Sequence, residues 1–266
     1  MRRATFKTIA TGLSLLFVWA CAEVHVRVPH GTQPGTGGPA SPEAKAPISL
    51  TELVARQKQR ETSTSSLSRA PASLCESTGG LGEEVRSYNQ ETGSWCWATS
   101  AQIVLEFHKE VSEQCLWVNQ ALSRGDCCGT RDFLAILNRW VTDTPSNCDG
   151  GGWPHWVFTP AGFDYERILA PGRAGSEEWT AYFAALKTQL CQNGPFISVI
   201  RWSEGGGHSQ VVRAINDVLQ VVEVNDHRDA DFNTRSFDVF IGDDADDPNG
   251  TFGYAQDVFY VEIQRL

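Results

Sequence analysis

The sequence lacks the excess of positive charge that proteins binding nucleic acids require, and it lacks the long apolar run that membrane-spanning proteins require. Its 266 residues include 22 Lys and Arg against 32 Asp and Glu, which gives a formal net charge of -10. A partner with a strongly negative surface, such as a nucleic acid or an acidic membrane, is therefore not expected. No internal repeat is present, and the hydrophobic content of 41% is that of an ordinary globular protein. These features predict one folded domain.

The chain also lacks an apolar run of the roughly 20 residues that a membrane-spanning helix needs. Its start is short and basic, and an apolar segment follows from about Thr8 to Trp19. This pattern predicts a cleaved export signal over residues 1–20. The sequence Val18-Trp19-Ala20-Cys21 resembles a bacterial lipobox, which predicts lipid on Cys21 and a place in the cell envelope. The alternative is a plain secretory signal with an incidental cysteine, and then a secreted or periplasmic protein.

After the signal, residues 21–74 are rich in Pro, Gly, Ser and Thr, which predicts a flexible tether or pro-region. Within it, apolar residues at residues 48–60 allow one short helix. That helix is either a docking or pro-region helix or a transient helix in a linker. The ordered domain is expected over residues 75–266.

Within this domain, apolar periodicity predicts helices over residues 96–109, 131–140 and 176–190. Segments rich in Val, Ile and Phe then follow, separated by Gly, Asn and Asp, which is typical of strands. They are PFISVIRW, SQVVRAI, VLQVVEV and DVFYVEI. Helices first and strands later predict an α+β fold, with a helical first half packed against an antiparallel sheet.

One cysteine stands at the start of the first predicted helix, in the segment SYNQETGSWCWATS. The unpaired backbone N–H groups and the positive dipole end of a helix N-terminus favour a thiolate there. Seven cysteines remain when Cys21 is set aside as the lipid site, and an odd number leaves one without a disulfide partner. The sequence therefore predicts that Cys96 is a nucleophile.

Partners for this thiol occur later in the chain. His208 follows three glycines at the start of a predicted strand, where it can act as a general base. The next strand ends in Asn225-Asp226, either of which could orient His208, but strand alternation lets only one of the two face it. Gln90, in the loop before the helix, could donate to an oxyanion together with the backbone N–H of Cys96.

These residues carry a resemblance to a known family. The order Gln, then Ser-Trp-Cys-Trp-Ala, then Gly-His, then Asn-Asp resembles the papain-like cysteine proteases, in particular the bacterial branch related to avirulence-effector proteases and bacteriocin-processing peptidases. The resemblance implies Cys96 as nucleophile, His208 as general base, Asp226 as orienter with Asn225 as the alternative, and Gln90 as oxyanion donor. It implies a protein or peptide substrate and no cofactor.

The remaining cysteines are expected to form disulfides, because the protein is expected to leave the cytoplasm. Their pairing is open among 15 arrangements, although adjacent Cys127 and Cys128 should each have a separate partner. The candidates are Cys75, Cys115, Cys127, Cys128, Cys148 and Cys191. A zinc site is the alternative, but no Cys-x-x-Cys spacing supports it, and no metal is predicted. The acidic segment 243–250 does not fit a calcium loop and is expected to be a solvated turn.

The sequence thus predicts an exported cysteine peptidase that hydrolyses peptide bonds through a Cys-His-Asp triad and a thioester. Two alternatives stay open. One is an amidase or acyl transferase on the same fold, and the other is a binding module that has lost activity.

The export signal supports a first testable prediction. We expect the mature protein, made in a bacterium that processes lipoproteins, to begin at Cys21 and to carry lipid there. Mass spectrometry of the N-terminal peptide measures this directly. An unmodified N-terminus at another residue would contradict lipidation and leave the plain secretory signal.

Overall fold

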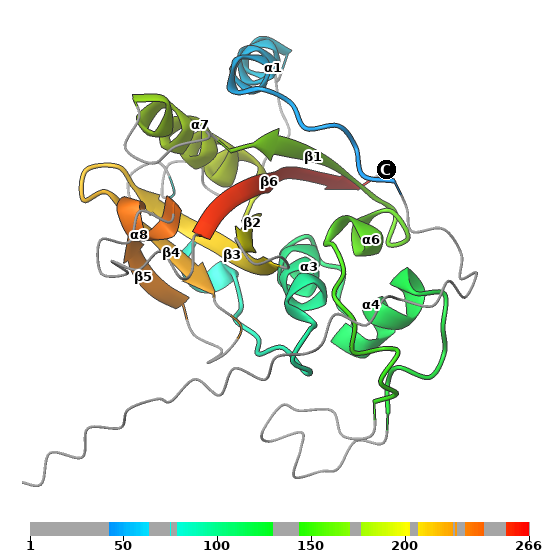
Figure 1. Ribbon diagram of the computed structural model, residues 1–266. Coiled ribbons are helices and arrows are strands. Elements are labelled where there is room, and N and C mark those ends of the chain that lie inside the picture. Colours follow the sequence, from blue (N-terminus) through cyan, green and yellow to red (C-terminus); the bar gives the residue numbers. More distant parts are fainter. Residues whose placement is uncertain are drawn as a thin grey trace, which may run out of the picture. The chain divides into compact units, whose positions relative to one another are not determined.

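The computed structural model describes residues 43–63, 75, 79–129, 144–170, 177–202, 207–225, 227, 232–241 and 254–265. Its centre is a six-stranded sheet in the order β1-β6-β2-β3-β4-β5 (Figure 1), and every neighbouring pair is antiparallel. The strands are β1 (Phe163–Leu169), β2 (Phe196–Trp202), β3 (Gly207–Asn216), β4 (Val221–Asn225), β5 (Phe232–Ser236) and β6 (Tyr254–Arg265). The α+β class with an antiparallel sheet is confirmed.

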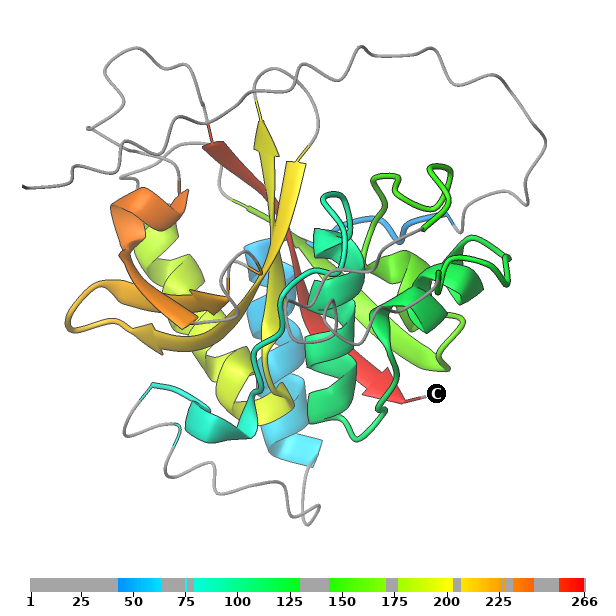
Figure 2. The same ribbon diagram turned by 90° about the horizontal axis from the view of Figure 1, so that it is seen from below.

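Helices cover both faces of the sheet. They are α1 (Leu50–Ser63), α3 (Cys96–Phe107), α4 (Gln114–Ala121), α6 (His155–Phe158), α7 (Glu177–Asn193) and α8 (Phe237–Ile241), with a 3-10 turn η1 at Gly82–Glu84. Figure 2 shows α7 and α8 on one side of the strands and α3 and α4 on the other. The sequence did not predict helices α4, α6 and α8 or strands β1 and β5.

Alternation along the strands explains why the sheet has two apolar faces. Ile197 and Val211 belong to the core under α3, α4 and α6, whereas their chain neighbours Phe196 and Val212 belong to the core under α7 and α8. All four side chains are fully buried. Because both faces are covered, β2 and β3 read as continuous apolar runs in the sequence.

The expected helix ends agree with the structure to within a few residues. Helix α3 spans Cys96–Phe107, and α7 stops at Asn193. Gly194 then takes a φ of +106°, and a Cβ at this position would lie 2.3 Å from the Phe107 ring. A glycine therefore both ends α7 and lets the chain pass close to α3.

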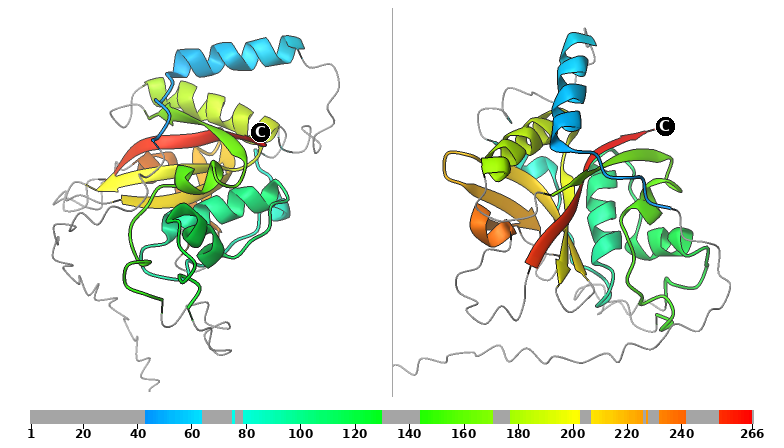
Figure 3. Two further views of the ribbon diagram at one scale, coloured as in Figure 1. Left: turned by 90° about the vertical axis from the view of Figure 1, so that its right-hand side faces the viewer. Right: turned by 45° about the horizontal axis from the view of Figure 1, so that its top comes forward.

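The segment at residues 43–63 is packed against the domain, so the domain begins well before the expected boundary at Cys75. Ile48 pairs with Ile168 of β1 in a parallel bridge, and Leu53, 2% exposed, lies in the core with α7. The amide of Gln57 donates to the Ala185 carbonyl at 3.0 Å. Figure 3 shows α1 lying over α7. The predicted helix is thus a docking helix, on the face of the sheet opposite α3.

Three disulfides form among the six candidate cysteines, and Cys96 is free. The pairs are Cys75–Cys191, Cys115–Cys128 and Cys127–Cys148. The expected separate partners for the adjacent cysteines are confirmed. Such a set of disulfides indicates an oxidising environment outside the cytoplasm.

Several expectations fall on residues outside those described. These are the signal and Cys21, the helix at 131–140, the acidic segment 243–250, and Asp226. In the part of the chain that the structure does describe, none of the helices has both the length and the apolar character needed to cross a membrane.

The docking of α1 can be tested by Leu53→Ala. We expect a loss of about 2–5 kcal/mol in the free energy of unfolding, because the substitution leaves a cavity in the α7 core. Urea denaturation measures the loss, and Leu219→Ala, at a side chain 69% exposed, is the matched control. Unchanged stability of Leu53→Ala would contradict docking. Alkylation of Cys96 by iodoacetamide should stay within about twofold of wild type, because α1 packs on the opposite face.

Candidate active site

Cys96 is the first residue of α3, and the loop before it positions the helix start. The helix is apolar through most of its length, and the residues from Trp97 to Leu105 are all buried. Such a helix can lie only in the core, between the sheet and α4. Cys96 itself is half-buried, so its thiol lies where the core meets the surface.

The tryptophans on either side of Cys96 anchor the helix start. Trp95 and Trp97 are 0% and 1% exposed. Their indole N–H groups donate to the carbonyls of Cys148 (2.8 Å) and Gly150 (3.2 Å). A Cβ at Gly152 would lie 2.5 Å from the Trp97 ring, so this loop needs glycine to pack against the tryptophan. Both tryptophans thus hold α3 to the loop at residues 148–153.

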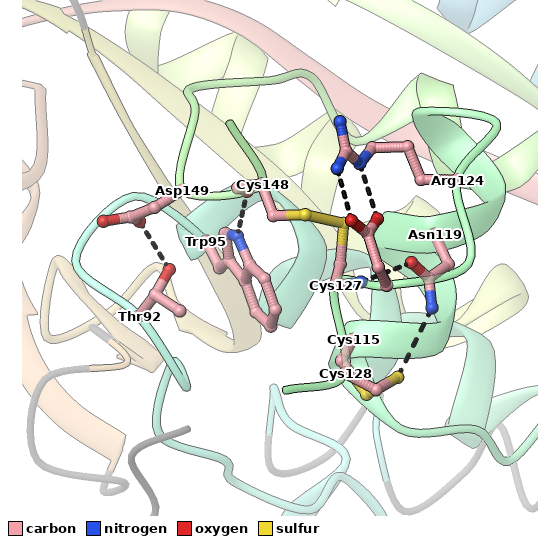
Figure 4. Close-up of a disulfide and its surroundings, with 10 residues drawn as sticks. Thr92, Trp95, Cys115, Asn119, Arg124, Cys127, Cys128, Cys148 and Asp149 are labelled. Atoms are coloured by element: carbon pink, nitrogen blue, oxygen red, sulfur yellow. Dashed lines mark hydrogen bonds and ion pairs between the residues drawn. A yellow bond between two sulfur atoms is a disulfide. The ribbon is translucent and has the colours of Figure 1, made fainter. Parts of the chain in front are cut away.

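Asp149, in the same loop, supplies polar contacts to the segment just before α3. Its carboxylate accepts hydrogen bonds from the Thr92 hydroxyl at 2.7 Å and the Ser94 backbone N–H at 3.2 Å. The preceding residue, Cys148, is bonded to Cys127 (Figure 4). A carboxylate near the start of a helix also complements the helix dipole. The approach to α3 is therefore held by a cross-linked loop.

His208 meets the thiol at the edge of strand β3. The pairing of β3 with β4 begins at Val211 and Asn225, so the described part of β4 does not reach His208 and Ser209 on that edge. Cys96 lies off this edge and forms a hydrogen bond with the His208 side chain. His208 is 8% exposed. The sequence-predicted nucleophile and base are thus in contact.

Several groups act on the pKa of the Cys96 thiol. Burial, the largest single influence, raises this pKa, whereas the hydrogen bond and the charge of His208 lower it. The backbone N–H groups of Ser209 and Trp97 lower it further, and the net pKa lies below the ordinary thiol value. The arrangement therefore favours a thiolate paired with a protonated imidazole.

A second histidine forms a buried network one helical turn further along α3. The Nε2 of His227 lies 2.6 Å from the Ser100 hydroxyl, and its Nδ1 contacts the side-chain oxygen of Asn225. The Asn225 amide donates to Ser87 at 2.5 Å, so its oxygen is the atom that accepts from His227. His227, Ser100 and Asn225 are each 0% exposed. A neutral His227 with its proton on Nδ1 satisfies this network.

The two histidines lie close together, with ring centroids 6.1 Å apart. His227 was not a candidate in the sequence, because it follows the Asn-Asp pair and has no motif of its own. Its φ of 57° marks a sharp change of direction after β4, which brings the ring back toward α3. Such a turn cannot be predicted from strand periodicity.

Gln90 lies in the loop that leads into α3. Its side-chain N–H donates to the Gly93 carbonyl at 3.0 Å, and its backbone N–H donates to the His227 carbonyl at 3.0 Å. A side-chain amide carries two N–H bonds, so this nitrogen has the capacity for a second hydrogen bond. In the described residues, the side-chain oxygen of Gln90 is buried and has no hydrogen-bond partner.

A cluster of metal-ligand atoms among the described residues comprises Asp126, Cys127 and Cys148. The two sulfurs are bonded to each other and are not free thiolates. This group has the chemistry of a disulfide site and does not have the donor set of a zinc site.

No protein-family model and no curated protein matches the sequence. Among solved structures, the chain shows similarity to the crystal structure of xylellain, a cysteine protease from Xylella fastidiosa. The similarity has a TM-score of 0.33 and 10% identity over 73% of this chain and 90% of that chain.

The pKa of Cys96 leads to a prediction about its alkylation by iodoacetamide. In wild type the rate should reach half its maximum below the pH found for the unfolded protein, because the folded pKa is lowered. In His208→Ala the midpoint should move to higher pH, because burial still raises the pKa and the opposing imidazole is gone. Stopped-time labelling with mass spectrometry gives both profiles. Superimposable profiles for wild type and His208→Ala would contradict the contact.

Proposed function

We propose that the protein is an exported, papain-like cysteine peptidase that cleaves peptide bonds through Cys96. The observation that carries the proposal is the free thiol at the N-terminus of α3, hydrogen-bonded to His208 and lowered in pKa. The other six cysteines in the described residues are disulfide-bonded. Cys96 is therefore the one free thiol among these residues.

The chemistry follows from these two side chains. The Cys96 thiolate attacks the carbonyl carbon, and the carbonyl oxygen becomes an oxyanion in a tetrahedral intermediate. Collapse of this intermediate expels the amine, which takes a proton from His208, and leaves a thioester on the sulfur. His208 then removes a proton from water, the hydroxide adds to the thioester, and the acid leaves with return of the thiolate. Gln90 donates to the oxyanion in both halves.

We assign the orientation of His208 to Asp226, with Asn225 as the alternative. Asn225 pairs with Val211 in the ladder between β3 and β4, three residues beyond His208 along β3. The Asn225 amide also contacts Ser87 and His227. These observations favour Asp226, the residue after Asn225, as the partner of His208.

Residues 21–74 include the docked α1, which packs on the face of the sheet opposite α3. This supports a scaffolding role for residues 43–63. An N-terminal lipid on Cys21 would hold the enzyme at a membrane, and the rest of the tether would set its reach.

The proposal is tested with an unbiased peptide library and five variants. Cys96→Ala should abolish cleavage, and His208→Ala should reduce it nearly as far, because the leaving amine then lacks a proton donor. Gln90→Ala should cost about 10²-fold or more in kcat/KM. Asp226→Ala should cost less than His208→Ala, and a larger loss in Asn225→Ala than in Asp226→Ala would reassign only the orienter.

Full cleavage by Cys96→Ala would overturn the proposal. Product analysis separates it from the alternative of an amidase or acyl transferase, because a transferase gives a product joined to an acceptor other than water. A protein that binds peptides without releasing any product would be a binding module.

A further inference from the structure

One buried side chain holds the loop that carries Gln90. Gln114 is the first residue of α4 and is 2% exposed. Its amide nitrogen donates to the Asn89 carbonyl at 2.7 Å, and its oxygen accepts from the Glu91 backbone N–H at 2.9 Å. The same oxygen accepts from the Thr99 hydroxyl of α3 at 2.8 Å. A single amide thus bonds to the backbone on both sides of Gln90 and to the nucleophile helix.

The residue between these two contacts is held as well. The backbone N–H of Gln90 donates to the His227 carbonyl at 3.0 Å, so three successive residues of the loop have a fixed hydrogen bond. Residues 86–95 form no helix or strand, so the regular backbone hydrogen bonds of such elements do not fix this loop. The side chain of Gln114 supplies hydrogen bonds to the loop backbone in their place.

The base of this clamp is itself rigid. Cys115, next to Gln114, is fully buried and bonded to Cys128. The Cys127 backbone N–H donates to Asn119 of the same helix at 2.8 Å (Figure 4). Helix α4 is therefore fastened at two points to the disulfide-linked segment, and Gln114 projects from a fixed support.

We propose that Gln114 is a positioning residue that fixes the Gln90 side chain as oxyanion donor relative to Cys96. The inference rests on the proposed function of Cys96 and Gln90. Glutamine suits this role because it carries a donor and an acceptor on one planar group, as Asn89 and Glu91 require. An oxyanion donor acts only when it is already in place as the charge develops, so the loop must not move.

The test compares two reactions of Cys96 that differ in their need for an oxyanion donor. Acylation by p-nitrophenyl acetate forms a tetrahedral oxyanion and releases p-nitrophenolate. Alkylation by iodoacetamide displaces iodide at a saturated carbon and forms no oxyanion. Both use the same thiolate, and neither requires knowledge of the natural substrate. The Cys96→Ala protein supplies the background of each assay.

The variant is Gln114→Glu, which keeps the acceptor and puts a second carboxylate oxygen against the Asn89 carbonyl. We expect the acylation rate to fall about 10- to 100-fold, because a displaced donor loses most of its effect. The alkylation rate should stay within about twofold, since Cys96 and His208 are untouched. Gln114→Met, of similar length and without charge, should behave in the same way if the acidic variant does not fold.

Two controls make the result specific. Gln120→Glu is the same substitution on the same helix, at an exposed amide that donates to the Pro160 carbonyl at 2.7 Å, and it should change neither rate. In a Gln90→Ala background, Gln114→Glu should have less than about a twofold further effect on acylation, because the group it positions is gone.

Equal losses of acylation and alkylation, or a full further loss in the Gln90→Ala background, would overturn the inference. So would a wild-type protein that is alkylated but not acylated. Failure of the peptidase proposal is a separate result: it is seen as absence of peptide cleavage in a protein whose acylation still depends on Gln114.

Discussion

The candidate site depends on how firmly the first turn of α3 is buried. Cys96 reaches the edge of β3 only because Trp95 and Trp97, its two neighbours, lie in the core and bond to the loop at residues 148–153. Burial of an indole contributes on the order of 5 kcal/mol before side-chain entropy is subtracted. The flanking tryptophans of the motif are therefore structural and make the chemistry of the cysteine possible.

The irregular segments around α3 obtain their order from covalent and polar links. Two disulfides close short loops between residues 115 and 148. Each loop lowers the conformational entropy of the unfolded chain, which corresponds to about 3 kcal/mol of stabilisation. On this frame, Asp149 holds the segment just before α3, and Gln114 holds the loop around Gln90. This construction suits an oxidising environment, in which disulfides persist.

Local patterns were sufficient to predict α3, α7, β2 and β3, because their apolar residues repeat with the period of the element and Gly or Pro marks the ends. Parity of the cysteine count was sufficient to predict one free thiol, and the motif around Cys96 assigned that thiol to it. Strands β1 and β5 have few β-branched residues and owe their pairing to distant partners, and α4 is short and mixed in composition. Apart from the neighbouring Asn225, the hydrogen-bond partners of His227 and Gln114 lie 15 to 137 positions away in the chain, so no window of sequence contains these contacts. Docking of α1 likewise depends on a surface of α7 formed elsewhere in the chain.

The network around His227 bears on the charge of His208. The ring centroids are 6.1 Å apart, and at this separation two positive charges would repel by about 3 kcal/mol with an effective dielectric constant near 20. Asn225 accepts the Nδ1 proton of His227, and the Ser100 hydroxyl can donate to Nε2, so the neutral ring is fully satisfied in a site closed to water. A neutral His227 would leave the positive charge to His208, which contacts Cys96. The residue that follows the Asn-Asp pair also holds the loop before α3, because its carbonyl accepts a hydrogen bond from the backbone N–H of Gln90.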